Sequence, residues 1–195
     1  MRISGGKARG IELKVPKGDR VRPATDGLRQ AVFSSLAAAV PGARFLDLFA
    51  GSGAYGLEAF SRGAAGGVFV ERDARAAACI RHNIEAVARS VGGDGPADLS
   101  VTQADALQIA AAPPGPLPEL VFIDPPYEII PEVAPILFAR LGALFANHPS
   151  AIVVFEFPGE LDLAPEGWNL VKRLGKGARQ PTAAFFRPKP RPPAP

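Results

Sequence analysis

The sequence predicts an α/β fold in which helices cover both faces of one mostly parallel sheet, preceded by a small N-terminal β-hairpin. Short apolar segments typical of buried strands alternate with segments of helical periodicity from about residue 43 onward. A glycine-rich turn joins the first of these strands to the helix after it. The 195 residues, of which 47% are hydrophobic and 21% charged, suffice for one globular domain with its own core.

The chain is expected to consist of three parts. An N-terminal extension of hairpin and helix covers residues 1–42, and the main α/β domain covers residues 43–187. Residues 188–195 form a proline-rich basic tail that is predicted to be disordered.

Two elements are predicted within the N-terminal extension. Residues 10–15 alternate apolar and polar side chains, as strands do, and residues 1–4 can pair with them across a glycine-rich turn. Thr25 or Asp26 can cap the helix that follows, and Pro41–Gly42 is expected to end that helix.

The main domain is predicted as a regular alternation of strands and helices. The predicted strands cover residues 44–49, 67–71, 99–102, 119–124 and 151–157, with two further short strands near 169–174 and 182–186. The predicted helices cover residues 54–62, residues 74–89 behind an Asp73 cap, and residues 131–146. In such sheets, ligands bind at the carboxyl ends of the strands, so the residues just after each strand carry the functional information.

A glycine-rich turn follows the first strand of the main domain. Gly51, Gly53 and Gly56 form a G-x-G-x-x-G pattern, and Glu71 stands twenty residues after the first glycine. This is the fingerprint of a dinucleotide site, and it predicts that backbone N–H groups approach a nucleotide cofactor. A tight turn without any ligand is the alternative interpretation.

Three carboxylates near this turn indicate which cofactor fits. Asp47 lies inside the first strand, where it would repel a pyrophosphate but attract an ammonium or sulfonium group, which favours S-adenosyl-L-methionine over a nicotinamide dinucleotide. Alternatively, the Asp47 carboxylate could accept hydrogen bonds from nearby backbone N–H groups, and both interpretations can hold together. Glu71 can bind the ribose hydroxyls of either cofactor. Asp105, after the third strand, can accept from an adenine amino group or cap a helix.

The most specific motif is D-P-P-Y, residues Asp124–Tyr127, directly after the fourth strand. Two prolines stiffen the backbone and remove two N–H donors. The Asp124 carboxylate and a neighbouring carbonyl then offer two acceptors for the exocyclic amino group of a base. The Tyr127 ring offers a stacking face for that base. A proline-stiffened strand end is the structural alternative.

Composition narrows the classes of function. One cysteine, Cys79, and two histidines do not suggest a metal site, and no apolar stretch reaches the about 18 residues of a membrane span. No signal sequence is recognised, so a cytoplasmic protein is expected. Residues 1–29 carry eight basic and three acidic side chains, and residues 172–195 carry seven basic and no acidic ones, which suggests a polyanionic partner.

The combination of D-L-F-A-G-S-G and D-P-P-Y resembles the class I S-adenosylmethionine-dependent methyltransferases, with a Rossmann-like sheet, that act on amino groups of bases. The N-terminal stretches M-R-I-S-G-G-K-A-R-G, L-K-V-P and R-P-A-T-D-G-L-R-Q-A-V-F resemble the RsmD family of bacterial 16S ribosomal RNA guanine-N2 methyltransferases. The resemblance extends to about residue 157 and weakens beyond it.

The resemblance implies a role for each motif residue. Cofactor contacts are implied for Gly51, Ser52, Gly53 and Glu71, with Asp47 and Asp105 near the cofactor. The target guanine would be held by Asp124, Pro125, Pro126 and Tyr127. Beside the active site would lie Arg22, Thr25 and Arg29. The chain departs from the family pattern at Gly27, Gln30, Ser34 and residues 172–175.

The resemblance implies transfer of a methyl group from S-adenosyl-L-methionine to guanine N2 in 16S ribosomal RNA of the small subunit. An adenine-N6 or other amino methyltransferase on DNA or RNA is the first alternative, because D-P-P-Y serves it equally well. A nicotinamide-dependent dehydrogenase and a non-catalytic RNA-binding protein are the others. A monomer that holds no metal is expected.

Overall fold

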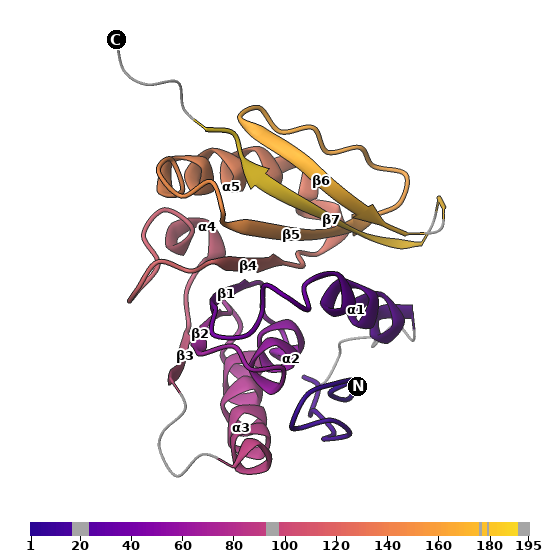
Figure 1. The fold of residues 1–195 in the computed structure, drawn as a ribbon, viewed down its shortest axis with the longest axis vertical. Coiled ribbons are helices and arrows are strands. Elements are labelled where there is room, and N and C mark those ends of the chain that lie inside the picture. The colour runs from indigo at the N-terminus through magenta and orange to yellow at the C-terminus, as the bar shows by residue number, and fades with distance from the viewer. Residues whose placement is uncertain (17–23, 93–97, 176, 179, 191–195) are drawn as a thin grey trace.

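The computed structural model describes residues 1–16, 24–92, 98–175, 177–178 and 180–190, and the side chains of residues 24 and 25 lie outside this description. One sheet with the strand order β3-β2-β1-β4-β5-β7-β6 organises the main domain (Figure 1). The strands from β3 to β5 in that order are parallel, whereas β7 runs antiparallel to both β5 and β6. The predicted, mostly parallel sheet is therefore confirmed.

The predicted strands and helices of the main domain are confirmed, with ends that differ by only a few residues. The strands are β1 (Arg44–Leu48), β2 (Gly66–Val70), β3 (Asp98–Thr102), β4 (Leu120–Ile123), β5 (Ile152–Pro158), β6 (Trp168–Leu174) and β7 (Pro181–Pro188). The helices are α1 (Ala24–Ser35), α2 (Ala54–Ser61), α3 (Ala74–Val91), α4 (Ala106–Ile109) and α5 (Ile130–Leu144), with a 3-10 turn at Tyr127–Ile129.

Two apolar clusters lie on opposite faces of the sheet because successive strand residues point to opposite sides. Along β1, Phe45 packs into the cluster that includes residues of α1, α2 and α3, whereas Leu46 and Leu48 pack into the cluster beneath α4 and α5. Helices therefore cover both faces, as predicted. Asp47 occupies a position on the same face as Phe45, so its carboxylate points toward α2 rather than toward α5.

The predicted N-terminal hairpin is present, but its two arms form only an isolated bridge rather than two full strands. Arg2 and Glu12 form an isolated antiparallel bridge, and the Ile3 amide donates to the Ile11 carbonyl at 3.0 Å. Glycine-rich turns occupy most of the intervening segment. In Figure 1 this segment lies beside α2, where the buried Glu58 carboxylate accepts hydrogen bonds from the Ser4 amide and hydroxyl.

The predicted boundaries of the first helix are wrong at both ends. α1 begins at Ala24, so Thr25 and Asp26 lie in its first turn, and Asp26 pairs with Arg29 one turn later at 2.9 Å. α1 ends at Ser35, and tighter turns lead from there to Pro41–Gly42. The Ala39 amide donates to the Leu36 carbonyl three residues back and the Val40 amide donates to the same carbonyl, so this segment is a tight turn after the helix.

Parts of three predictions fall on undescribed residues. Residues 93–97 belong to the predicted loop after α3, residues 191–195 belong to the predicted disordered tail, and Arg22 was expected beside the active site. The division into an extension, a domain and a tail stays a prediction. Among the described residues, no helix has the length and apolar character that a membrane span requires.

Candidate active site

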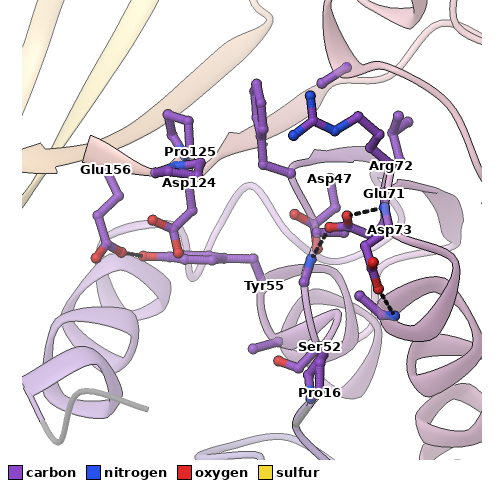
Figure 2. A pocket seen from close by; sticks show the side chains of 18 of the residues that line it. Pro16, Asp47, Ser52, Tyr55, Glu71, Arg72, Asp73, Asp124, Pro125 and Glu156 are labelled. Atoms are coloured by element: carbon purple, nitrogen blue, oxygen red, sulfur yellow. Dashed lines mark hydrogen bonds between the residues drawn. The ribbon is translucent and has the colours of Figure 1, made fainter. Parts of the chain in front are cut away.

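A pocket of about 810 Å³ lies at the carboxyl ends of β1, β2 and β4, where the sequence predicted ligand binding. Residues at the starts of α2, α3 and α4 line it, together with Glu156 of β5 and three residues of the N-terminal segment, Met1, Val15 and Pro16. Figure 2 shows acidic side chains on two sides of this pocket. The N-terminal segment thus forms part of the wall.

The glycine-rich turn bends sharply between β1 and α2. Phe49, Gly51 and Gly53 all have positive φ values, of 58°, 53° and 78°, which turn the chain back over the sheet edge. Gly51 is open on the side where a side chain would stand, so a ligand can approach its backbone closely. A Cβ at Gly56 would lie 2.4 Å from the Phe69 ring, so the third glycine serves helix–sheet packing.

Asp47 is a buried carboxylate, 2% exposed, at the floor of the pocket. Its Oδ2 accepts a hydrogen bond of 2.9 Å from the Gly56 amide at the start of α2. Burial raises the pKa of Asp47 to about 8, the Gly56 hydrogen bond opposes this rise, and the charge of Glu71 adds to it. A cation in the pocket would favour the ionised form of this group.

Glu71 follows β2 and holds two turns in place. Its Oε2 accepts from the Gly51 amide at 2.9 Å, and its Oε1 accepts from the Asp73 amide at 2.8 Å. Asp73 caps α3 by accepting from the Arg75 and Ala76 amides, as predicted. Glu71 therefore links the glycine-rich turn to the start of α3 while it lines the pocket.

Asp105 caps α4, accepting from the Leu107 amide at 2.7 Å. The helix-cap interpretation of this residue is confirmed, and Asp105 also lines the pocket. Contact with an adenine amino group stays a prediction.

Asn83, which the sequence did not predict as a site residue, connects Ser52 of the glycine-rich turn to the N-terminal segment. The Ser52 carbonyl accepts from the Asn83 amide group at 2.9 Å, and Asn83 also bonds the backbone of Lys14 through both its oxygen and its nitrogen. The Ser52 hydroxyl lies 3.3 Å from the Met1 sulfur. Asn83 lies on the buried face of α3. The helical periodicity of the sequence predicts that face but not the contacts of Asn83.

The D-P-P-Y motif follows β4 directly and enters the same pocket. Asp124 and Tyr127 are half-buried, Pro125 is buried and Pro126 is exposed, and all four line the pocket. Tyr127 begins the 3-10 turn that leads into α5, and the Pro126 carbonyl accepts from the Ile129 amide at 3.2 Å. The structure thus brings the motif together with the glycine-rich turn.

A buried pair beside this motif was not predicted. The Tyr55 hydroxyl donates to Glu156 Oε2 at 2.6 Å, and both side chains are buried. Burial raises the pKa of Tyr55 well above its ordinary value, and the charges of Glu156 and Asp124 raise it further, so Tyr55 remains a neutral donor. The only signal in the sequence was an acid inside the apolar run A-I-V-V-F-E-F.

The three residues expected beside the active site have different outcomes. Arg22 and the Thr25 side chain lie outside the described residues. Arg29 lines the pocket but is only 2% exposed. Its Nη2 donates to the Arg2 carbonyl at 2.7 Å, and its Nε lies 3.6 Å from the buried Glu58 carboxylate. Arg29 therefore anchors the N-terminal segment to the domain.

The described part of the chain contains no group of three or more metal-ligating side chains that could hold a metal ion.

Comparison with known proteins identifies the family. Residues 1–184 match the family described as Conserved hypothetical protein 95. The Ribosomal RNA small subunit methyltransferase D of Escherichia coli strain K12 is 33% identical over 172 residues, covering 87% of this chain and 82% of that protein. Its namesake from Haemophilus influenzae is 30% identical over 180 residues, covering 91% and 89%.

Solved structures share the fold of this chain. Escherichia coli yhhF has a TM-score of 0.75 at 30% identity, covering 98% of this chain and 99% of that one. An RNA methyltransferase from Salinibacter ruber, solved in complex with S-adenosyl-L-homocysteine, shares the fold with a TM-score of 0.60 at 19% identity, covering 89% and 98%. The chain therefore belongs to the Conserved hypothetical protein 95 family, which is the RsmD family that its motifs resemble.

Proposed function

We propose that this protein transfers a methyl group from S-adenosyl-L-methionine to the exocyclic N2 of a guanine in 16S ribosomal RNA. One observation carries the proposal: the glycine-rich turn and the D-P-P-Y motif open into one pocket. Family membership and the names of the relatives support ribosomal RNA as the substrate. A dehydrogenase would not need D-P-P-Y in its cofactor pocket.

The residues present fit S-adenosyl-L-methionine. The pocket volume of about 810 Å³ lies within the usual range for ligand sites. Asp47 is a buried carboxylate that a cation would stabilise and a pyrophosphate would not. Glu71 would bind the ribose hydroxyls, and Asp105, which lines the same pocket, would accept from the adenine amino group.

When bound, S-adenosyl-L-methionine supplies a methyl group that its sulfonium already activates. The main task of the chain is therefore alignment. Asp124 and the Pro125 carbonyl would accept the two N–H groups of guanine N2, so that the nitrogen lone pair points toward the methyl carbon. Tyr127 would stack on the base.

Methyl transfer would form the new N–C bond from the lone pair of guanine N2 and break the C–S bond, whose electrons would remain on sulfur. The products are N2-methylguanine, S-adenosyl-L-homocysteine and one proton. Asp124 would receive that proton, because in this proposal it is the carboxylate that binds the amino group.

The target nucleotide must leave its base stack, because a paired base cannot reach a pocket at the edge of the sheet. Arg2, Lys7, Arg9 and Lys14 are exposed on the N-terminal segment that forms one wall of the pocket. These side chains would bind RNA phosphates, so binding should weaken as the salt concentration rises. We expect a monomer that acts in the cytoplasm.

Tritium transfer tests the proposal. Labelled S-adenosyl-L-methionine is incubated with the protein and with small ribosomal subunits, or their RNA, from cells that lack the cognate enzyme. Nucleoside digestion then identifies the product. N2-methylguanosine is the expected product, N6-methyladenosine would favour the adenine alternative, and absence of label in every acceptor would contradict the proposal.

A further inference from the structure

We propose that Glu156, oriented by Tyr55, selects guanine by accepting the hydrogen bond of its N1–H group while Asp124 binds its N2 amino group. Nothing in the family motifs points to Glu156, which lies on β5, whereas D-P-P-Y follows β4. The inference rests on the proposed function and identifies the residue that would make the same site specific for guanine.

The sheet places the two carboxylates side by side. β4 and β5 are parallel neighbours in which Ile123 pairs with Phe155, so the next residues along the two strands, Asp124 and Glu156, are adjacent across the sheet. Neighbouring strands lie about 4.8 Å apart, a spacing that suits contact with adjacent groups on one base. Both side chains line the pocket, and Figure 2 shows both carboxylates close to the Tyr55 hydroxyl.

Glu156 is an unusual residue for its position. It is only 3% exposed, lies between the buried Phe155 and Phe157, and interrupts an apolar strand. A carboxylate buried to this extent is costly without hydrogen-bond donors. The Tyr55 hydroxyl supplies one donor at 2.6 Å, and its ring stacks on Phe122, which fixes the hydroxyl beside the pocket.

The hydrogen bond from Tyr55 does not use all the acceptor capacity of the Glu156 carboxylate. An ionised carboxylate has about four lone-pair sites, so Glu156 can accept from Tyr55 and from a donor in the pocket. Because the Tyr55 hydroxyl stays protonated in this environment, it acts as a donor and holds the Glu156 side chain in one orientation. Tyr55 is thus a positioning residue.

The chemistry of the bases makes this second carboxylate selective. Guanine presents the N1–H donor next to the N2 amino donor on its Watson–Crick edge, whereas adenine presents the N1 acceptor next to its N6 amino group. Asp124 and the Pro125 carbonyl recognise an amino group on either base. A carboxylate facing N1 would attract the N1–H of guanine and repel the N1 lone pair of adenine.

The test uses 2-aminopurine, which keeps the amino group at position 2 but carries an acceptor at N1. The full-length protein is given S-adenosyl-L-methionine and small subunits reconstituted with guanosine or 2-aminopurine riboside at the methylated position. Wild type is compared with Glu156→Gln, Tyr55→Phe and the control Glu132→Gln, which alters an exposed residue of α5. The readout is the ratio of kcat/KM for the two acceptors.

Wild type and Glu132→Gln should prefer guanine by about 10- to 100-fold, the usual value of one hydrogen bond to a charged group. In Glu156→Gln this preference should nearly vanish, because the amide can donate to the N1 acceptor of 2-aminopurine. Tyr55→Phe keeps the ring and loses only the hydroxyl, so its preference should fall by a smaller factor.

Two results would overturn the inference, and they differ in what they say about the proposed function. If Glu156→Gln lowered kcat/KM equally for both acceptors, Glu156 would be only structural, while guanine-N2 methylation would stand. If wild type methylated no guanine in unmodified small subunits, both the proposed function and this inference would fail.

Discussion

The two sides of the pocket are held together in different ways. The proposed cofactor side consists of Asp47, Glu71 and Asp105, whose carboxylates accept from backbone amides nine, twenty and two residues away in the chain. The proposed base side consists of Asp124, Tyr55 and Glu156, and its Tyr55–Glu156 hydrogen bond joins residues 101 positions apart. Figure 2 shows Asp47 and Glu71 on one side of the pocket and Asp124, Tyr55 and Glu156 on the other.

This structural difference suggests that the two sides of the pocket have different functions. The cofactor side is built from turns and helix starts, whose backbone amides fix the carboxylates before any ligand binds. The base side is built from side chains that meet only when β4, β5 and α2 have assembled. We therefore expect changes on the cofactor side to alter cofactor affinity, and changes on the base side to alter turnover and base selection.

The largest effect is expected for Asp124→Ala on the base side. Loss of the acceptor that aligns the amino group should lower kcat by about 10²- to 10⁴-fold. Cofactor affinity, measured by calorimetry, should change by less than about threefold. The control is Asp162→Ala, which removes a carboxylate that is 95% exposed and pairs with Arg173. Unchanged turnover in Asp124→Ala would contradict the proposed role.

On the cofactor side, Glu71→Ala should weaken S-adenosyl-L-methionine binding by about 10- to 100-fold, because hydrogen bonds to charged groups are lost. The variant also releases the Gly51 amide from its carboxylate partner. Turnover at saturating cofactor should fall much less. Glu85→Ala, an exposed position on α3, is the matched control. If Glu71→Ala lost turnover but kept its affinity for S-adenosyl-L-methionine, the proposed difference between the two sides of the pocket would be contradicted.

The third glycine of the turn tests packing rather than ligand contact. Gly56→Ala should lower the free energy of unfolding by about 1–3 kcal/mol, because its methyl group would overlap the rings of Phe45 and Phe69. Gly27→Ala in α1 is the matched control, since nothing lies within 4 Å of its added Cβ. It should stabilise the protein by about 0.5–1 kcal/mol, the usual helical gain of Ala over Gly. Urea denaturation measures both variants.

The smallest effect is a pH dependence set by Asp47. Burial raises the pKa of this acid from 3.8 to about 8, so the folded protein retains the proton across neutral pH. The contribution of this group to stability is complete below about pH 4 and is lost as the pH rises through about 8. A cationic cofactor favours the ionised form, so its binding should release a proton.

Wild-type affinity for S-adenosyl-L-methionine should therefore improve severalfold relative to Asp47→Asn as the pH is raised from about 6 to about 8. The amino group of the cofactor titrates in both proteins, so the ratio of the two dissociation constants isolates Asp47. Calorimetry at several pH values measures this ratio. A ratio that does not change with pH would show that Asp47 does not sense the cofactor charge.

Most of the cofactor side could be predicted because its signals are local. The glycine-rich turn, the Asp73 cap and the cap interpretation of Asp105 depend on residues close together in the chain, and the structure confirms them. The predicted cap at Thr25 or Asp26 failed although it was also local. Asp26 pairs with Arg29, a buried residue whose other contacts reach Arg2 and Glu58.

Periodicity and motifs depend on near neighbours, so they predicted the strands and the longer helices, the turn after β1, the D-P-P-Y motif and the family resemblance. Only the tertiary structure placed Glu156 beside Asp124 and Asn83 between Lys14 and Ser52. Strand order and helix packing decide those contacts. A single acid in an apolar strand, or an asparagine on a helix, does not reveal which distant residue it will meet.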